Sequence, residues 1–250
     1  MHVAGIGWWS QSDTDWASLA ARLRASETVA PGRGGARPAA TSLPPNERRR
    51  APLPVLLACE AAGQACAMAG LAPATLPCVF ASVHGDLAIT HEMCETLARD
   101  PRELSPTRFH NSVHNAPAGY WTVATGCHAP SNAVSAWHGS FGAGLLEAAV
   151  QACADDVPVL FAACDIAADG PLARVVDARD PFAVALVLAP GPVDPCLARL
   201  ALRHVAEPAE RNADPAFAAL PLLRAIALGA SSTIRIACGE GHSLDVGVGR

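Results

Sequence analysis

Apolar residues recur along the chain in two kinds of run, and the two kinds alternate. Short runs that are apolar on both faces predict buried strands, whereas longer runs with apolar positions three and four residues apart predict helices. The predicted strands are residues 2–9, 77–82, 131–137, 157–165, 182–188, 196–205, 233–237 and 244–248. The predicted helices are residues 17–26, 55–70, 89–99, 117–125, 139–154 and 216–228.

Polar segments rich in proline separate some of these elements. Residues 30–54 carry several prolines and glycines and an arginine run, 48–50, so they predict a surface loop whose arginines face solvent or hold a ligand. Residues 105–115 predict an irregular polar segment. Asp13 or Thr14 is expected to cap the first helix. Strands that alternate with helices and are apolar on both faces indicate an α/β sandwich with a covered sheet, and residues 1–250 are predicted to form one domain.

Composition narrows the class of protein. Hydrophobic residues make up 51% of the 250 positions and charged residues 16%, which is typical of a folded chain. The net charge of −5 argues against a dedicated nucleic-acid binder. All 18 basic residues are arginine, which excludes a lysine Schiff base or a P-loop lysine.

Membrane insertion and export are not expected. The longest apolar run, residues 182–190, is far shorter than a membrane helix, and the N-terminus lacks the basic segment of a signal peptide. The nine cysteines form no C-x-x-C pair, so we expect small buried thiols in a reducing cytoplasm. His110 and His114 have a metal-ligand spacing but no evident third ligand, and no G-x-G-x-x-G motif follows a strand. No metal or cofactor is therefore expected.

The most informative segment is residues 130–150, PSNAVSAWHGSFGAGLLEAAV. A β-type run enters a turn of small residues, and a helix follows. This geometry exposes a side chain at a helix N-terminus, where backbone N–H groups favour negative charge. The candidates for that side chain are His138 and Ser140.

Two interpretations of this turn follow from the residues alone. In one, Ser140 is the nucleophile of a serine hydrolase, with Asp165 and either His204 or His242 completing a triad. The segment misses the G-x-S-x-G elbow by its first glycine. In the other, the small residues only permit close packing of the helix.

A wider stretch of sequence suggests a third interpretation. Residues 115–126, NAPAGYWTVATG, followed by Pro130-Ser131, resemble the N-x-x-A-G helix, glycine and G-P-S turn of the β-ketoacyl synthase family in the thiolase superfamily. Other segments match the same family in order along residues 1–190. They are Gly5-Ile6-Gly7, residues 47–50 with the helix after them, residues 79–85, and Leu104-Ser105-Pro106 with Phe109. The resemblance implies a truncated thiolase-like α/β/α sandwich with a mixed sheet, a core of residues 1–190 and a reduced C-terminal part, 191–250.

The resemblance also implies that the catalytic machinery is missing. Counted from Pro130-Ser131, the nucleophilic cysteine of the family falls on His138, and His204 and His242 lack the flanking motifs of the family's catalytic histidines. The chain is similar in shape to the short ketosynthase-like proteins of aryl polyene clusters, which act as chain length factors. The implied partner is a complete β-ketoacyl synthase, and an acyl carrier protein would be reached through that complex.

The resemblance implies two contact regions. Residues 130–137 would supply an edge strand at a two-fold axis, and residues 107–115 would lie near the end of the partner's acyl tunnel. The residues expected at the tunnel wall or interface are Thr107, Phe109, Ser112, Val113, Asn115, Val134 and Trp137.

Overall fold

The computed structural model describes residues 1–27, 37–168, 170–174, 176, 180–209 and 216–250. Eight strands form one mixed sheet in the order β3-β2-β4-β5-β1-β6-β8-β7. The strands are β1 (His2–Ser10), β2 (Cys78–Ala81), β3 (Ser131–Val134), β4 (Val159–Asp165), β5 (Phe182–Ala189), β6 (Ala198–Val205), β7 (Ser232–Gly239) and β8 (His242–Gly249). Strand β2 is parallel to β3 and β4, and the remaining neighbours are antiparallel. The predicted mixed, covered sheet is confirmed.

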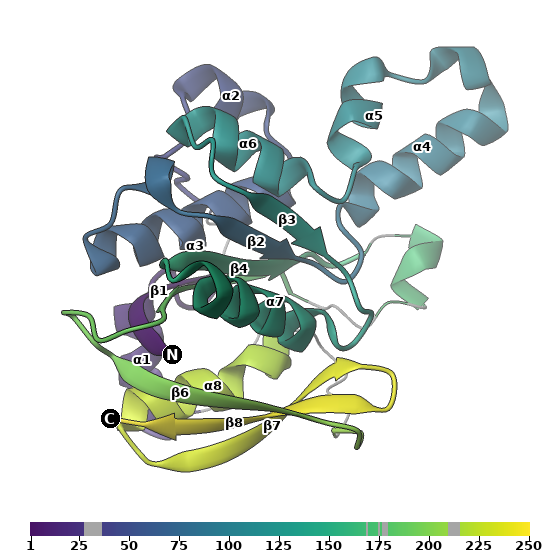
Figure 1. Cartoon of the computed structure of the whole chain (residues 1–250). Helices are drawn as coiled ribbons and strands as arrows, with labels where there is room; N and C mark the ends of the chain where they lie inside the picture. Colours follow the sequence, from purple (N-terminus) through teal and green to yellow (C-terminus); the bar gives the residue numbers. More distant parts are fainter. Residues whose placement is uncertain (28–36, 169, 175, 177–179, 210–215) are drawn as a thin grey trace.

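Helices cover both faces of the first five strands (Figure 1). The α-helices are α1 (Trp16–Arg24), α2 (Pro45–Arg50), α3 (Leu53–Ala69), α4 (Leu87–Arg99), α5 (Pro106–Ser112), α6 (Ala116–Thr125), α7 (Ser140–Asp155) and α8 (Ala216–Leu228). Short 3₁₀ helices are η1 (Pro73–Thr75), η2 (Pro101–Glu103) and η3 (Gly170–Arg174).

The side chains of β1 point alternately to the two faces of the sheet and so contribute to two separate core clusters. Val3, Ile6 and Trp8 pack with α1, α7 and α8, whereas Ala4 and Trp9 pack with α3 and α6 on the other face. Successive side chains of a strand point to opposite faces, so a strand buried on both sides must be apolar throughout. This requirement explains the continuous apolar run at the start of the sequence.

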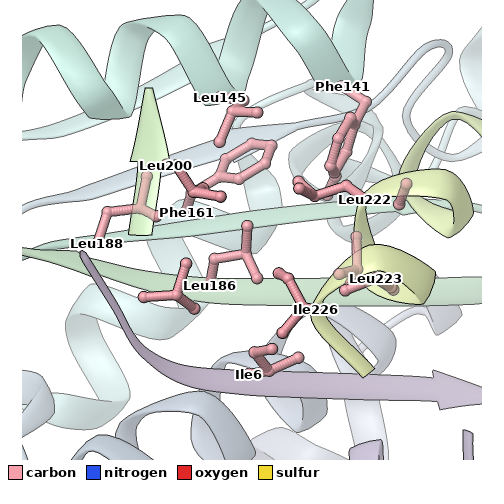
Figure 2. Close-up of a cluster of buried hydrophobic side chains, with 14 of the residues drawn as sticks. Ile6, Phe141, Leu145, Phe161, Leu186, Leu188, Leu200, Leu222, Leu223 and Ile226 are labelled. Atoms are coloured by element: carbon pink, nitrogen blue, oxygen red, sulfur yellow. The ribbon is translucent and has the colours of Figure 1, made fainter. Parts of the chain in front are cut away.

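Helix α7 lies between two parts of the sheet. It contacts β2 and β4 on one side and β7 on the other. A Cβ added to Gly142 would lie 2.2 Å from the Ala237 carbonyl oxygen, and one added to Gly144 would lie 2.6 Å from the Phe161 ring. These glycines let the helix approach both layers closely. Figure 2 shows the resulting cluster, in which Phe141 and Leu145 of α7 lie near side chains of β4, β5 and α8.

Helices α4 and α5 form an arm that projects from the body of the molecule (Figure 1). The prediction of an irregular segment at 105–115 was wrong, because α5 spans Pro106–Ser112. Ser105 caps this helix by accepting a hydrogen bond from the Arg108 N–H, and proline suits a first helical position. Arg108 also forms an ion pair with Glu92 of α4.

Two further predictions require correction. Part of the expected surface loop is helix α2, and Ala40, Leu43 and Ala51 in the same segment are buried. Residues 28–36 lie outside the described residues. The cap of the first helix is Asp15, whose carboxylate accepts a hydrogen bond from the Ser18 N–H, rather than Asp13 or Thr14. Within the described ranges, no helix is both long and apolar enough to cross a membrane.

Candidate functional site

The turn between β3 and α7 has the predicted strand–turn–helix form. Strand β3 ends at Val134 and α7 begins at Ser140. Trp137 adopts a left-handed backbone conformation with φ of 52°, which costs a non-glycine residue about 1–2 kcal/mol. A Cβ on Gly139 would lie 2.5 Å from the Gly239 nitrogen. The turn is therefore held tightly against the end of β7.

Trp137 and His138 line a cavity of about 620 Å³ at the N-terminus of α7. The opposite wall includes Gly239 and Gly241 at the tip of the β7–β8 hairpin. Trp137 is 54% exposed, and its ring meets the His138 ring edge to face at 5.3 Å. The His84 ring approaches the same indole at 5.0 Å. An exposed aromatic side chain thus stands beside His138 at the cavity.

Ser140 has a structural role in this turn. Its side chain is 2% exposed, and its Oγ donates to the Trp137 carbonyl oxygen at 2.7 Å. The same Oγ accepts from the Ala136 N–H at 3.0 Å. A hydroxyl that is buried and engaged on both sides is poorly placed to attack a substrate.

The two hydrogen bonds of the Ser140 Oγ go to backbone groups and not to a histidine. His204 and His242 stack on each other at 5.1 Å on β6 and β8, where both are exposed, whereas Ser140 is buried. Asp165, at the end of β4, accepts hydrogen bonds from the Ser82 hydroxyl and the Val83 N–H, each at 2.8 Å. The serine hydrolase interpretation is not supported by this geometry.

The predicted wall residues fall into separate places. Thr107, Phe109 and Ser112 lie on α5, and Val113 follows that helix. Asn115 precedes α6. Val113 and Asn115 line a groove of about 320 Å³ with residues of α2 and α6. Thr107 borders a different cavity beneath the arm.

The remaining two wall residues, Val134 and Trp137, lie at the end of β3 and in the turn after it. Strand β3 is at one edge of the sheet, and within the described residues it pairs with β2 alone. Helices α6 and α7 flank it on either side (Figure 1). Both carry exposed valines, Val123 at 81% and Val150 at 55%. The sequence analysis missed these two residues, although their apolar character within helices was visible.

The described part of the chain holds no group of three or more histidine, cysteine, aspartate or glutamate side chains placed to bind a metal ion. His110 lies on α5, whereas His114 lies beyond its end with Nε2 2.9 Å from the Ser82 carbonyl oxygen. The two imidazoles therefore do not share one helix face.

A family model of the β-ketoacyl synthase N-terminal domain matches residues 16–241. The chain belongs to this family. A search of curated proteins found no match. The predicted family is confirmed, and the match spans both the turn before α7 and the α4–α5 arm.

Solved structures of similar fold include chains of ketosynthase complexes and a β-ketoacyl synthase. One chain of the complex of the ketosynthase ApeO with its chain length factor ApeC from Xenorhabdus doucetiae superposes with a TM-score of 0.77 at 23% identity, covering 98% of each chain. A chain of the ishigamide ketosynthase/chain length factor gives 0.72 at 14% identity, covering 99% of this chain and 98% of that one. A β-ketoacyl synthase from Burkholderia phymatum STM815 gives 0.64 at 15% identity, covering 92% of this chain and 70% of that one. The thiolase-like ketosynthase fold is confirmed.

Proposed function

We propose that this protein is a non-catalytic ketosynthase-like subunit, a chain length factor. It would pair with a complete β-ketoacyl synthase in aryl polyene, polyketide or fatty-acid-type chain elongation. The observation that carries the proposal is the unpaired edge of β3 within the described residues, together with exposed apolar side chains on the elements next to it, Val123 on α6, Val150 on α7 and Trp137 in the following turn. Exposed strand edges and apolar patches favour association with a partner. Such a complex would be cytoplasmic.

The lack of catalysis rests on His138. If it occupies the position of the family's nucleophilic cysteine, no thiolate is available there to accept an acyl group. The cysteine nearest in sequence, Cys127, lies before β3, at the opposite end of that strand from the turn. It is buried, and its thiol donates to the Leu76 carbonyl oxygen. Acyl groups delivered by an acyl carrier protein would therefore react on the partner. Similar relatives include one in which a type II acyl carrier protein is bound to its ketosynthase.

The backbone of β3 offers a definite pairing edge. The Cys78 N–H bonds the Pro130 carbonyl, and the Ser82 N–H bonds the Val134 carbonyl. In a parallel ladder this register directs the N–H and C=O groups of residues 132 and 134 toward β2. The groups of residues 131, 133 and 135 then point outward, where a strand of the partner would bind them.

The wall assignment is part of the same proposal. Phe109 and Val113 are exposed in the isolated chain. A partner that covers them would turn their side chains toward the end of its acyl tunnel. Each methylene of a growing chain is worth about 0.8 kcal/mol of burial, so a bulkier wall residue should stop elongation earlier.

The proposal also keeps the division of the chain into a core, residues 1–190, and a reduced part, 191–250. Strand β5 ends at Ala189 and β6 begins at Ala198, so the proposed boundary lies between these two strands.

Condensation assays with the reconstituted pair test this function. Changing the partner's nucleophilic cysteine to alanine should abolish product formation, whereas His138→Ala in this chain should not abolish it. Val113→Trp should shorten the product and Phe109→Ala should lengthen it. Pairs that assemble normally but give unchanged product lengths would refute the wall assignment, and loss of condensation with His138→Ala would refute the non-catalytic role.

A further inference from the structure

The cavity beneath the α4–α5 arm, which Thr107 borders, has a volume of about 640 Å³. Its apolar lining includes Leu53, Ile89 and Ile166. Its polar lining includes Arg50 and Asn111. The volume is within the range of small-molecule sites, which are mostly apolar with a few fixed polar groups.

The arginine run 48–50 contributes one residue to this cavity. Arg48 donates to the Ala39 carbonyl oxygen at 3.1 Å, and Arg49 donates to the Asn46 side chain. Arg50 lines the cavity, and within the described part of the chain its guanidinium makes no hydrogen bond or ion pair. Of the three arginines, Arg50 is the one whose donors remain for a ligand.

Asn111 provides a second donor. Its side chain is 6% exposed, and its Oδ1 accepts a hydrogen bond from the Tyr120 hydroxyl at 3.1 Å. This contact fixes the amide so that Nδ2 remains a donor at the cavity.

The other charged groups at the cavity are already engaged. Arg108 and Glu92 pair with each other. Asp86 accepts a hydrogen bond from the Ile89 N–H at the start of α4, and burial raises the pKa of its carboxyl group. Within the described residues, Arg50 is therefore the cation of the lining that makes no hydrogen bond or ion pair.

We propose that this cavity binds an amphipathic monocarboxylate. The carboxylate would bind the guanidinium of Arg50, which presents paired donors suited to two carboxylate oxygens, and would accept a hydrogen bond from Asn111 Nδ2. The apolar body of the ligand would lie on Leu53, Ile89 and Ile166. The site is formed by this chain alone, although Thr107, Arg108 and Asn111 of its lining belong to the segment 107–115 that is proposed to face the partner.

Calorimetric titration of the full chain with octanoate and with octanol tests the proposal, because the two probes share an eight-carbon chain and differ in the carboxylate. Octanoate should bind at least about tenfold more tightly, as expected for a charge-assisted hydrogen-bonded pair. Arg50→Ala should remove this preference, and Asn111→Ala should reduce it. Arg49→Ala is the matched control, because it removes the same charge from the same helix outside the cavity, and it should keep the preference.

Equal affinity for the two probes would overturn the proposal, as would octanoate binding that survives Arg50→Ala. Displacement of octanoate by millimolar inorganic phosphate would show a simple anion site and would contradict the apolar part of the proposal. Thermal unfolding of each variant confirms that it is folded. The assay contains no ketosynthase, so its failure leaves the proposed subunit role untouched, and failure to pair with a ketosynthase leaves this result untouched.

Discussion

The hydroxyl of Ser140 donates a 2.7 Å hydrogen bond to the carbonyl oxygen of Trp137, three residues earlier. The bond closes the turn that brings His138 to the N-terminus of α7. The Ser140 hydroxyl oxygen also accepts a hydrogen bond from the Ala136 N–H. Ser140→Ala should therefore leave both backbone groups unsatisfied and lower the free energy of unfolding by about 1–3 kcal/mol. Urea unfolding measures this loss, and Ser131→Ala on the exposed edge is the control.

The same contact predicts that the wild-type protein does not react with a fluorophosphonate probe, since the Ser140 hydroxyl is buried and engaged. Intact-mass spectrometry of the folded protein is the measurement. An adduct that disappears in Ser140→Ala would restore the hydrolase interpretation and contradict a purely structural role.

Close packing of α7 on β7 predicts opposite effects for two helical glycines. Gly142→Ala would place a methyl group 2.2 Å from the Ala237 carbonyl oxygen, and we expect a loss of about 3 kcal/mol in the free energy of unfolding. Gly119→Ala, on α6, meets nothing within 4 Å and should raise stability by about 0.5–1 kcal/mol. Equal effects of the two substitutions would show that α7 is not clamped between the two parts of the sheet.

Thiol reactivity should follow burial. Burial raises the pKa of both Cys66 and Cys78 to about 12, so neither thiol supplies appreciable thiolate near neutral pH. Cys94, Cys153 and Cys196 are exposed. Iodoacetamide at pH 8 followed by peptide mass spectrometry should modify these three in the native protein, and Cys66 and Cys78 only after unfolding. Rapid native labelling of Cys66 and Cys78 would contradict their burial in the core.

The pH dependence of stability should carry a contribution from Asp86. Burial raises the pKa of this carboxyl group above its ordinary 3.8. The folded state then binds more protons than the unfolded state between 3.8 and the raised value, so the contribution of Asp86 improves as pH falls through that window and worsens as pH rises.

Asp86→Asn isolates this contribution, because asparagine caps a helix as well as aspartate does. At pH 7 the variant should be at least as stable as the wild type, and its advantage should shrink as the pH approaches 4. Asp86→Ala, which removes the cap on the Ile89 N–H, should lose about 1 kcal/mol. The opposite result would be a wild type that is more stable than Asp86→Asn at pH 7 and loses this advantage as the pH falls. It would show that the folded state stabilises the Asp86 carboxylate, and the prediction would be wrong.

The sequence predicted the elements whose burial leaves a regular pattern. Strand β1 and helix α3 are apolar over long stretches, and both were placed within two residues of their observed ends. Helix α5 was missed because its seven residues include only one buried side chain, Asn111, so no apolar stripe marks it. Local capping by Ser105 was visible in the sequence, yet it carries weight only once a helix is suspected.

The site was predictable to the extent that it is local. The strand, turn and helix around His138 follow from consecutive residues. The contact of Gly142 with Ala237 joins residues almost a hundred positions apart, and sheet order decides it. The same is true of His204 and His242, which the antiparallel pairing of β6 and β8 stacks on each other instead of delivering to Ser140.

The most direct test of the subunit role is whether the outward edge of β3 holds a complete β-ketoacyl synthase. Proline at residue 133 removes an outward N–H but none of the bonds to β2, so Ala133→Pro should leave the chain folded and disrupt pairing across the edge. Size-exclusion chromatography with light scattering, after co-expression with complete synthases, should show a heterodimer for the wild type and for Ala133→Thr, and none for Ala133→Pro. A chain that stays alone with every synthase, or an Ala133→Pro variant that pairs as well as the wild type, would contradict the account.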